Sequence, residues 1–457
     1  MDCTVTPLKT LMGFSVHLNV QLKFYNLPNL LANFVSQKSL SQTGEGIQAT
    51  VKFLKELLEQ FIHAKVEIIE TAGNPIIIAT LSPEKDNEYL FYGHYDVQLP
   101  GKLAEWKVKP FKLTQRDGRL YGRGTGDNKG QLVAQICGFY VYQQLYGELP
   151  FTARILIEGE EEIGSPHLLQ TVRALKDPYL NNLSAVFVTD GSMIQSGDHV
   201  LRLGNRGVLS FRLGVRTNES ALHSGNFGNV SKNAAVELMR VLNKLINPLT
   251  GQCRIKEFYK EVVEPSSQER EWLSSLPSPY NIPAPIYKDK FDYYYRLMFQ
   301  PSMTINGLSS GYEGDGVKTI IPGKATAIID CRLVANQTCD EVIKLINNTL
   351  KAELNEEQIQ IKYLVKLDPV KIAASNPLIP RLVSTITEAT GKALIEPVMP
   401  GSVPNYIWKD IIGIPPFTIP LANYDQHNHA PNENITIDAF LDGIKIITYL
   451  CRNLNSK

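Results

Sequence analysis

The chain lacks the features that mark membrane, nucleic-acid-binding and disulfide-rich proteins. Its 46 Lys and Arg residues balance 46 Asp and Glu residues, so no charge excess indicates a nucleic-acid or acidic-membrane partner. No apolar run approaches the ~18 residues of a membrane-spanning helix. The six cysteines are scattered without a Cys-x-x-Cys pair, which favours buried free thiols over a disulfide framework. We therefore expect a cytoplasmic protein with neither a nucleic-acid nor a membrane partner.

The length of 457 residues predicts two domains, at roughly 100–200 residues per domain. In the first two hundred residues, short apolar runs alternate with amphipathic or apolar helical patterns, which is typical of an α/β domain with a buried, mostly parallel sheet. The expected helices cover 43–61 and 131–145, and the expected strands cover 65–69, 76–80, 89–92, 153–157 and 185–188.

The pattern changes at Gly207, where apolar and polar residues begin to alternate. This alternation predicts a half-exposed antiparallel strand at 209–215. Further helices are expected at 233–246 and 340–354, and further strands at 325–333 and 359–365. Together these elements predict a βαββαβ-like module. A segment rich in Pro, Ser and Tyr lies within it at 248–301. Helical patterns at 377–390 and 437–450 follow. We expect a catalytic domain formed by 1–206 and 370–457, with an inserted domain at 207–369.

Acidic and imidazole clusters follow or lie near several of the expected strands. They are His94-Tyr95-Asp96, Gly126-Asp127-Asn128-Lys129-Gly130, Glu160-Glu161-Glu162, Thr189-Asp190-Gly191 and His429-Ala430-Pro431-Asn432-Glu433. Side chains at the carboxyl ends of strands point into the crevice where α/β enzymes bind ligands. Imidazoles and carboxylates together suit zinc or a similar divalent ion. The five clusters in this order predict a two-metal hydrolase.

Each cluster has an ordinary alternative when it is taken alone. His94 could lie in a surface turn, and the three adjacent glutamates could form a solvated charge run. The glycines at 122–130 fit neither a phosphate loop nor a dinucleotide-binding frame, so we expect them to turn the backbone and present Asp127. His427 and His429 are equivalent by chemistry alone. A lone arginine such as Arg332 is either a surface ion-pair partner or a clamp for a carboxylate.

The chain resembles the co-catalytic dizinc exopeptidase and deacylase family, which includes carnosine dipeptidase, acetylornithine deacetylase, succinyl-diaminopimelate desuccinylase, aminoacylase and carboxypeptidase G. The resemblance runs from about Leu40 to the end of the chain. It rests on Gly93-His94-Tyr95-Asp96-Val97, Trp106, Pro110-Phe111, Gly118-Arg119-Leu120-Tyr121-Gly122-Arg123-Gly124, Asp127-Asn128-Lys129-Gly130, Glu161-Glu162-Ile163-Gly164-Ser165, Asp190, His223-Ser224-Gly225, Arg332 and His429-Ala430-Pro431-Asn432-Glu433.

The resemblance implies a role for each matching residue. One metal ion is expected at His94, Asp190 and Asp127, and the other at Glu162, His429 and the same Asp127. Zinc is the expected metal, and manganese or cobalt would also suit these ligands. Glu161 matches the general base, and Asp96 matches the carboxylate behind His94. His223 matches a histidine that reaches the partner's active site and helps stabilise the oxyanion, Arg332 matches the residue that binds the substrate's carboxylate, and Thr319 and Ser402 match further substrate contacts.

The implied reaction is hydrolysis of an amide bond by a hydroxide that bridges two metal ions, with Glu161 as the base. The segment 248–301 and the run from His223 to Gly228 look like those of carnosine-type dipeptidases. We therefore expect a homodimeric dipeptidase, joined through the inserted domain, that acts on dipeptides with a free carboxylate. An N-acyl-amino-acid deacylase is the alternative, and a non-catalytic binding protein on the same fold is the remote one. The run Thr189-Asp190-Gly191-Ser192 departs from the Asp-Asn-aromatic run of eukaryotic carnosine dipeptidases, so β-alanyl-His specificity does not follow.

Overall fold

The computed structural model describes residues 27–279, 282–356 and 359–454. The chain divides into two compact units. Of the described residues, unit 1 contains those up to Leu201, Ser375–Ile395 and those from Ile407 onward, and unit 2 contains those of Arg202–Ala374 and Glu396–Tyr406. No helix in the described residues is long and apolar enough to cross a membrane.

The short segment Glu396–Tyr406 groups with unit 2, although it lies within the range 370–457 that was expected to belong to the catalytic domain. Its first residue forms an ion pair with Arg202, at 2.5 Å between the Arg202 Nε and Glu396 Oε2 atoms. The Met399 backbone also exchanges hydrogen bonds with Gly204 and Arg206. These contacts join two stretches of chain that lie almost two hundred residues apart, and a sequence pattern does not display such a connection.

Unit 1 is built around an eight-stranded sheet with the order β1-β2-β6-β3-β7-β18-β8-β17. The neighbours β6–β3, β3–β7 and β7–β18 are parallel, and β1–β2 and β2–β6 are antiparallel. The predicted α/β class with a mostly parallel central sheet is confirmed. The strands are β1 (Lys65–Ile69), β2 (Ile76–Leu81), β3 (Glu88–His94), β6 (Thr152–Glu158), β7 (Leu183–Val188), β8 (His199–Arg202), β17 (Ala393–Glu396) and β18 (Pro416–Thr418).

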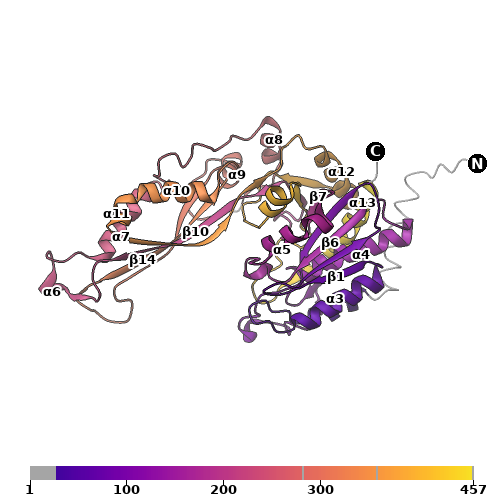
Figure 1. Cartoon of the computed structure of the whole chain (residues 1–457), viewed down its shortest axis with the longest axis horizontal. Coiled ribbons are helices and arrows are strands. Elements are labelled where there is room, and N and C mark those ends of the chain that lie inside the picture. The colour runs from indigo at the N-terminus through magenta and orange to yellow at the C-terminus, as the bar shows by residue number, and fades with distance from the viewer. Residues whose placement is uncertain (1–26, 280–281, 357–358, 455–457) are drawn as a thin grey trace, which may run out of the picture. The chain divides into compact units, whose positions relative to one another are not determined.

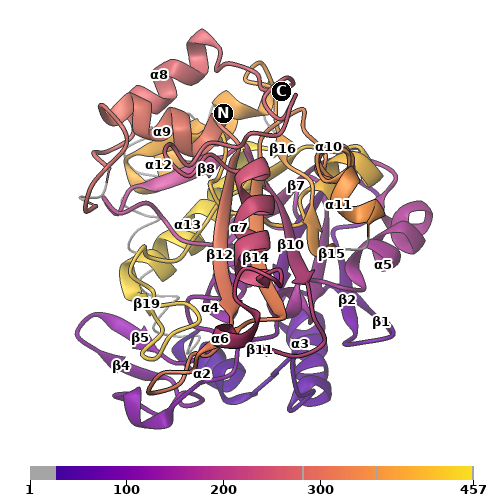
Figure 2. The same cartoon turned by 90° about the vertical axis from the view of Figure 1, so that its left-hand side faces the viewer.

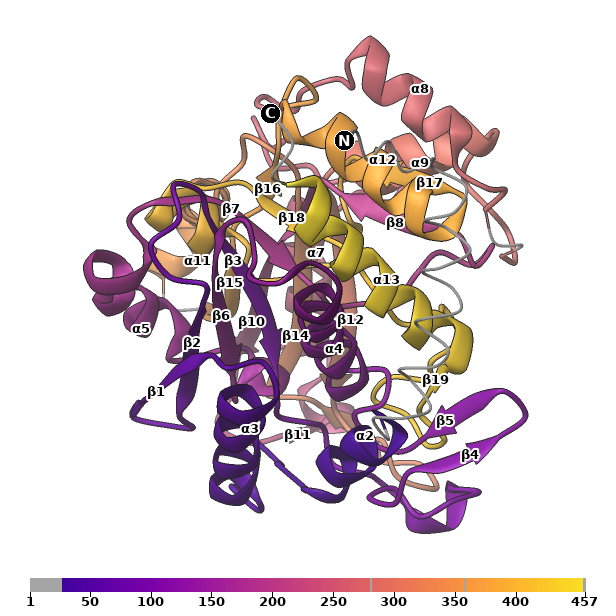
Figure 3. The ribbon, with the colours of Figure 1, turned by 90° about the vertical axis from the view of Figure 1, so that its right-hand side faces the viewer.

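Helices pack against this sheet and against one another. They include α2 (Leu27–Ser36), α3 (Ile47–Phe61), α4 (Lys129–Tyr146), α5 (Leu168–Leu175), α12 (Leu378–Thr390) and α13 (Ile437–Asn453). The helices α4 and α13 lie side by side (Figure 3). They approach so closely that a Cβ atom at Gly138 would lie 2.5 Å from the Ile447 Cβ atom. The predicted helix at 43–61 begins at Ile47 instead, because Gly44 and Gly46 have φ angles of 76° and 80° and form a turn.

Unit 2 is built around a four-stranded antiparallel sheet with the order β12-β14-β10-β15. The strands are β10 (Gly207–Arg216), β12 (Ser302–Ser310), β14 (Lys324–Leu333) and β15 (Ile359–Leu367). The helices α7 (Ala234–Leu245) and α10 (Cys339–Thr349) pack on one face of the sheet, and Figure 2 shows α7 in front of the strands. The chain order of these six elements is βαββαβ, as the alternation along the sequence predicts.

Three features of unit 2 differ from the sequence-based expectation. The strand β12 was not among the expected strands. The predicted helix at 340–354 is divided at Leu350 into α10 and a short α11 (Lys351–Asn355), which lie in line in Figure 1. The segment 248–301 contains α8 (Ser267–Ser275) and α9 (Lys290–Phe299), which the composition did not indicate. The helix α8 begins with a reciprocal capping box between Ser266 and Glu269, so a local signal for that helix was present.

Small sheets position two loops that matter for the site. In unit 1, β19 (Asn434–Thr436) pairs with β5 (Arg119–Tyr121), which itself pairs with β4 (Thr114–Arg116). This pairing places the loop before β19 beside the glycine-rich run at 122–130. In unit 2, β11 (Leu222–His223) pairs with β13 (Ile320–Ile321), so His223 lies opposite Ile320.

Candidate metal centre

Five side chains from separate segments of unit 1 converge on one place. His94 ends β3, Asp190 follows β7 by two residues, and Glu162 lies in a short helical turn after β6 (η2, Glu161–Ile163). Asp127 lies two residues before α4, and His429 lies in the loop before β19. Two sets offer ligand atoms that all lie within 4.8 Å of one another: His94 with Asp127 and Asp190, and Asp127 with Glu162 and His429.

The Asp127 carboxylate belongs to both sets and turns one oxygen towards each. Its Oδ1 atom lies 3.0 Å from His94 Nε2, and its Oδ2 atom lies 3.3 Å from His429 Nε2. Beyond it, Asp190 Oδ2 is 3.9 Å from His94 Nε2, and Glu162 Oε2 is 2.8 Å from His429 Nε2. A carboxylate in this position can contact two cations at once.

The donor set fits divalent metal ions. The Glu162 Oε2 atom is buried and makes no hydrogen bond to the described residues, although His429 Nε2 lies beside it. An imidazole nitrogen and a carboxylate oxygen that face each other without a hydrogen bond are arranged as two ligands of one ion. The carboxylates lie close together, and burial and the neighbouring Asp127 raise the pKa of Asp190 to about 6. Mixed imidazole and carboxylate ligands suit zinc, and also manganese or cobalt.

Asp96 connects the imidazole to the glutamate turn. Its carboxylate Oδ1 lies 3.3 Å from His94 Nδ1, and both groups are fully buried. The two oxygens of the same carboxylate accept hydrogen bonds from the backbone N–H groups of Glu161 and Glu162, at 3.2 and 3.1 Å. Asp96 therefore directs Nε2 of His94 towards the cluster and fixes the turn that carries both glutamates.

Glu161 lies at the edge of the cluster and belongs to neither ligand set. Its Oε2 atom is 4.0 Å from His94 Nε2, and its side chain is 22% exposed. Burial raises the pKa of Glu161 well above its usual value, with a further contribution from the negative Asp190 and Asp127, whereas His94 acts in the opposite direction. A carboxylate with a raised pKa that keeps access to solvent is suited to accept a proton and return it.

Two buried residues that organise the cluster were given no role in the sequence analysis. The Asn128 side chain donates to the Thr189 carbonyl (2.7 Å) and to Asp190 Oδ1 (3.2 Å), and it accepts from the His94 N–H (3.3 Å). It thereby connects two of the candidate ligands. The only signal in the sequence is a polar residue directly after Asp127.

The second residue is Glu433, which fixes the glycine-rich loop. Its carboxylate accepts hydrogen bonds from the N–H groups of Gly124, Gly126 and Asp127, at 2.9–3.0 Å. It also pairs with the buried guanidinium of Arg123, at 2.7 Å. The backbone position of Asp127 thus depends on a carboxylate 306 residues further along the chain. Glu433 forms part of the motif quoted above, but the sequence does not reveal its role.

The structure brings some of the remaining candidates together within unit 2. Arg332 Nη1 donates to the Ser402 hydroxyl at 3.0 Å, and Arg332 Nε donates to Asp330 at 3.2 Å. The exposed His223 lies 3.4 Å from the Thr319 hydroxyl, measured at Nε2. Its Nδ1 atom accepts from the Gly225 N–H, so Nε2 carries the hydrogen in the neutral ring.

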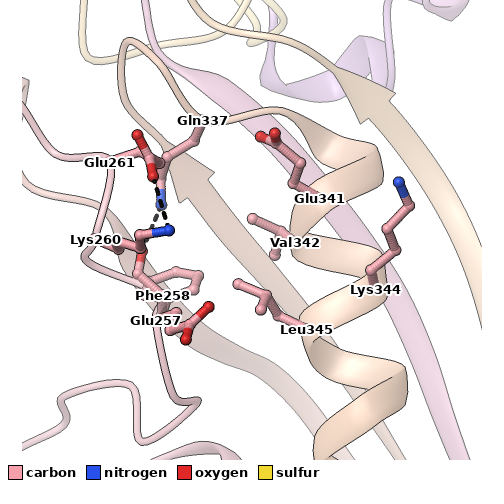
Figure 4. Close-up of a pocket in the computed structure, with 9 residues that line it drawn as sticks. All are labelled: Glu257, Phe258, Lys260, Glu261, Gln337, Glu341, Val342, Lys344 and Leu345. Carbon is pink, nitrogen blue, oxygen red and sulfur yellow. Dashed lines mark hydrogen bonds and ion pairs between the residues drawn. The ribbon is translucent and has the colours of Figure 1, made fainter.

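His427 and a hollow in unit 2 contribute nothing to the cluster. His427 is exposed and belongs to neither ligand set, so the geometry distinguishes it from His429. The hollow measures about 210 Å³ and lies between the segment at 257–261 and α10 (Figure 4). Phe258 and Val342 line it with charged residues around them. None of its lining residues belongs to either ligand set.

Comparisons with known proteins agree on one group of enzymes. The model of peptidase family M20/M25/M40 matches residues 90–453. Human Beta-Ala-His dipeptidase is 27% identical over 389 residues, which cover 81% of this chain and 76% of the relative. The Cys-Gly metallodipeptidase DUG1 of Saccharomyces cerevisiae is 26% identical over 426 residues, or 86% and 87% of the two chains. The M20 family metallo-carboxypeptidase Sso-CP2 of Sulfolobus solfataricus superimposes with a TM-score of 0.84 at 28% identity, covering 93% of this chain and 98% of the other.

Proposed function

The chain belongs to the M20/M25/M40 peptidase family, and we propose that it is a metal-dependent dipeptidase whose substrates carry a free C-terminal carboxylate. The observation that supports this best is the shared Asp127. Its two oxygens face His94 and His429. Each of these histidines belongs to one of the two ligand sets that share Asp127. A binuclear centre of this kind is suited to hydrolysis of an amide bond.

The substrate class follows from what the similar proteins have in common. Two of them are named for the dipeptides β-Ala-His and Cys-Gly, and a third is named as a carboxypeptidase. In a dipeptide, the only peptide bond is also the bond next to the C-terminal residue. A site that anchors a terminal carboxylate therefore accounts for both kinds of name. The pair of Arg332 and Ser402 supplies such an anchor, because the guanidinium fork matches the geometry of a carboxylate.

In this proposal the metal ions occupy the two ligand sets. His94, Asp190 and Asp127 hold one ion, and Glu162, His429 and Asp127 hold the other. Zinc is the metal that we propose, because Zn²⁺ binds imidazole nitrogens and carboxylate oxygens in sites of this kind. When bound, such ions supply Lewis acidity that polarises the scissile carbonyl and lowers the pKa of a water molecule.

The side chains carry the proton transfers. Glu161 takes a proton from the attacking water and passes it to the departing amine, because its carboxylate lies beside the two ligand sets without belonging to either. Asp96 keeps the His94 ring oriented while the charge in the site changes. His223 donates a hydrogen bond from Nε2 to the developing oxyanion, and Thr319 contacts the substrate beside it.

We further propose that the enzyme is a homodimer joined through unit 2, so that His223 acts in the active site of the partner. The strand β12 forms one edge of the sheet in unit 2. Several apolar side chains of this unit are exposed, including Val236, Met239 and Leu308.

We also propose a cytoplasmic location, because all five described cysteines are buried free thiols and cytosolic proteins rarely contain disulfides.

Removal and return of the metal test this function. Treatment of the purified enzyme with a chelator should abolish hydrolysis of a dipeptide panel, and zinc, manganese or cobalt should restore it. N-acetylated amino acids serve as the comparison substrates, and we expect kcat/KM to be higher for the dipeptides. Full activity in demonstrably metal-free protein would contradict the metal-dependent mechanism. A preference for N-acetylated amino acids would instead identify a deacylase.

A further inference from the structure

Arg206 is a largely buried arginine that forms no ion pair with any described residue. Its side chain lies in unit 2, and the residue is only 8% exposed. The Nε atom donates to the Pro400 carbonyl at 2.9 Å. Its two Nη groups have no hydrogen-bond acceptor among the described residues, and no described carboxylate forms an ion pair with it. Neither Nη atom is among the buried polar atoms that lack a partner in the described residues, so both keep some exposure and are accessible to a ligand.

A second arginine lies beside it. Arg206 comes two residues before Val208, and Val208 pairs across the sheet with Arg332. One short loop contacts both guanidinium groups, because Pro400 accepts from Arg206 and Ser402 accepts from Arg332. Burial, followed by repulsion from Arg332, lowers the pKa of Arg206 to about 10, and Asp330 offsets part of this effect. Two like charges are therefore held close together inside the same unit.

The net charge of Arg206, Arg332 and Asp330 together is the charge that one bound carboxylate would neutralise. Arg206 and Arg332 contribute two positive charges, and Asp330, which accepts from Arg332 Nε, contributes one negative charge. One net positive charge remains, and a single carboxylate neutralises it. A second carboxylate would leave a net negative charge in the site. The unpaired Nη groups of Arg206 supply the donors that such a ligand needs.

We propose that Arg206 and Arg332 together bind the C-terminal carboxylate of the substrate, and that Arg206 determines the preference for free acids over amides. This inference rests on the proposed dipeptidase function and adds a second arginine to its substrate site. A neutral C-terminal amide would leave two guanidinium groups with only one neighbouring carboxylate. The amide would therefore bind much less well than the acid.

Substitution of Arg206 tests this inference in the metal-loaded enzyme. The substrates are L-alanyl-L-alanine and its C-terminal amide. We expect Arg206→Met to lower kcat/KM for the free acid by about 10- to 100-fold, the range for loss of a charged hydrogen bond, and to leave the amide almost unaffected. The ratio of the two kcat/KM values is the readout, because a general structural defect lowers both. Arg212→Met is the matched control, since Arg212 is an exposed arginine on β10, and it should preserve the ratio.

Other outcomes also decide the inference. If Arg206→Met does not fold, Arg206→Lys keeps the charge but loses the fork, and the acid-to-amide ratio should still fall. An unchanged ratio in folded, metal-loaded Arg206 variants would overturn the inference and leave the dipeptidase function intact. If the wild type hydrolyses neither substrate, the proposed function fails. Calorimetric titration with L-alanine then decides the point, because binding that Arg206→Met abolishes supports the carboxylate site and equal binding overturns it.

Discussion

Asp96 shows how a single buried residue organises the candidate centre. One carboxylate orients the His94 ring and accepts the backbone N–H groups of Glu161 and Glu162. The imidazole and the two glutamates therefore cannot move independently. The different roles proposed for the two glutamates then depend only on where each side chain points. Glu162 Oε2 faces His429, whereas Glu161 Oε2 faces His94 from 4.0 Å.

This difference predicts opposite behaviour for two neighbouring substitutions. Glu161→Gln should retain both metal ions but lower kcat by about 10²–10⁴-fold, because an amide cannot relay a proton. Glu162→Gln should weaken the binding of one ion, because it replaces a ligand oxygen of the second set. Metal content per subunit, measured beside kcat, distinguishes the two. If Glu161→Gln loses metal and Glu162→Gln does not, the assignment of base and ligand is reversed.

The sequence predicted the candidate ligands but not the residues that hold them in place. His94, Asp127, Glu162, Asp190 and His429 were identified because each lies in a short motif that the family resemblance covers. Asn128 and Glu433 act through contacts with distant segments, such as the hydrogen bond between Glu433 and Asp127. Sequence spacing carries no information about such contacts. The choice between His427 and His429 likewise depends on how the loop before β19 folds.

At the scale of elements, the glycine-rich loop before α4 depends on a residue next to β19. The two oxygens of Glu433 accept hydrogen bonds from three loop N–H groups and from Nη1 of the buried Arg123. Alanine at Gly126 would bring its Cβ atom to 2.0 Å from Gln426 Oε1, so the loop also packs tightly against the segment before His429. The position of Asp127 therefore depends on the strand pair β5–β19.

Glu433→Gln should accordingly damage both stability and metal binding. The substitution removes the charge that compensates Arg123 and turns an NH₂ group towards backbone donors. Breaking one partner of a buried ion pair costs about 3–5 kcal/mol of unfolding free energy, which urea unfolding measures. Asp425→Asn is the control, because the exposed pair of Asp425 and Arg119 should contribute only about 0–1 kcal/mol. Equal losses in the two variants would contradict the role of Glu433.

The order and type of most elements followed from periodicity, whereas their ends did not. The strand β1 matches its predicted range, and the helices α7 and α13 begin within a residue of theirs. The helix α10 ends at Thr349 because the chain leaves helical geometry at Leu350, where ψ is 15°. The apolar spacing continues through that point and so did not reveal the break. The helices α8 and α9 were missed because their segment is rich in proline and serine.

At the scale of the whole molecule, the candidate residues are divided between the two units. Unit 1 contains the candidate ligands and Glu161, and unit 2 contains His223, Arg332 and Arg206. The family resemblance proposed from the motifs is confirmed by the match over residues 90–453. Assembly is the one part of the proposal that involves a second chain. Each active site of the proposed dimer combines Glu161 from one subunit with His223 from the other.

Mixing two inactive variants tests this assembly. His223→Ala subunits keep Glu161, and Glu161→Gln subunits keep His223, so a heterodimer contains one complete site out of two. Half of a statistically mixed population is heterodimer, so we expect about one quarter of wild-type activity, because catalysis needs the base and the oxyanion donor in one site. Subunit exchange is verified by differently tagged chains, and each variant incubated alone is the control. Activity that does not recover after complete exchange would show that His223 acts within its own chain or has no part in catalysis.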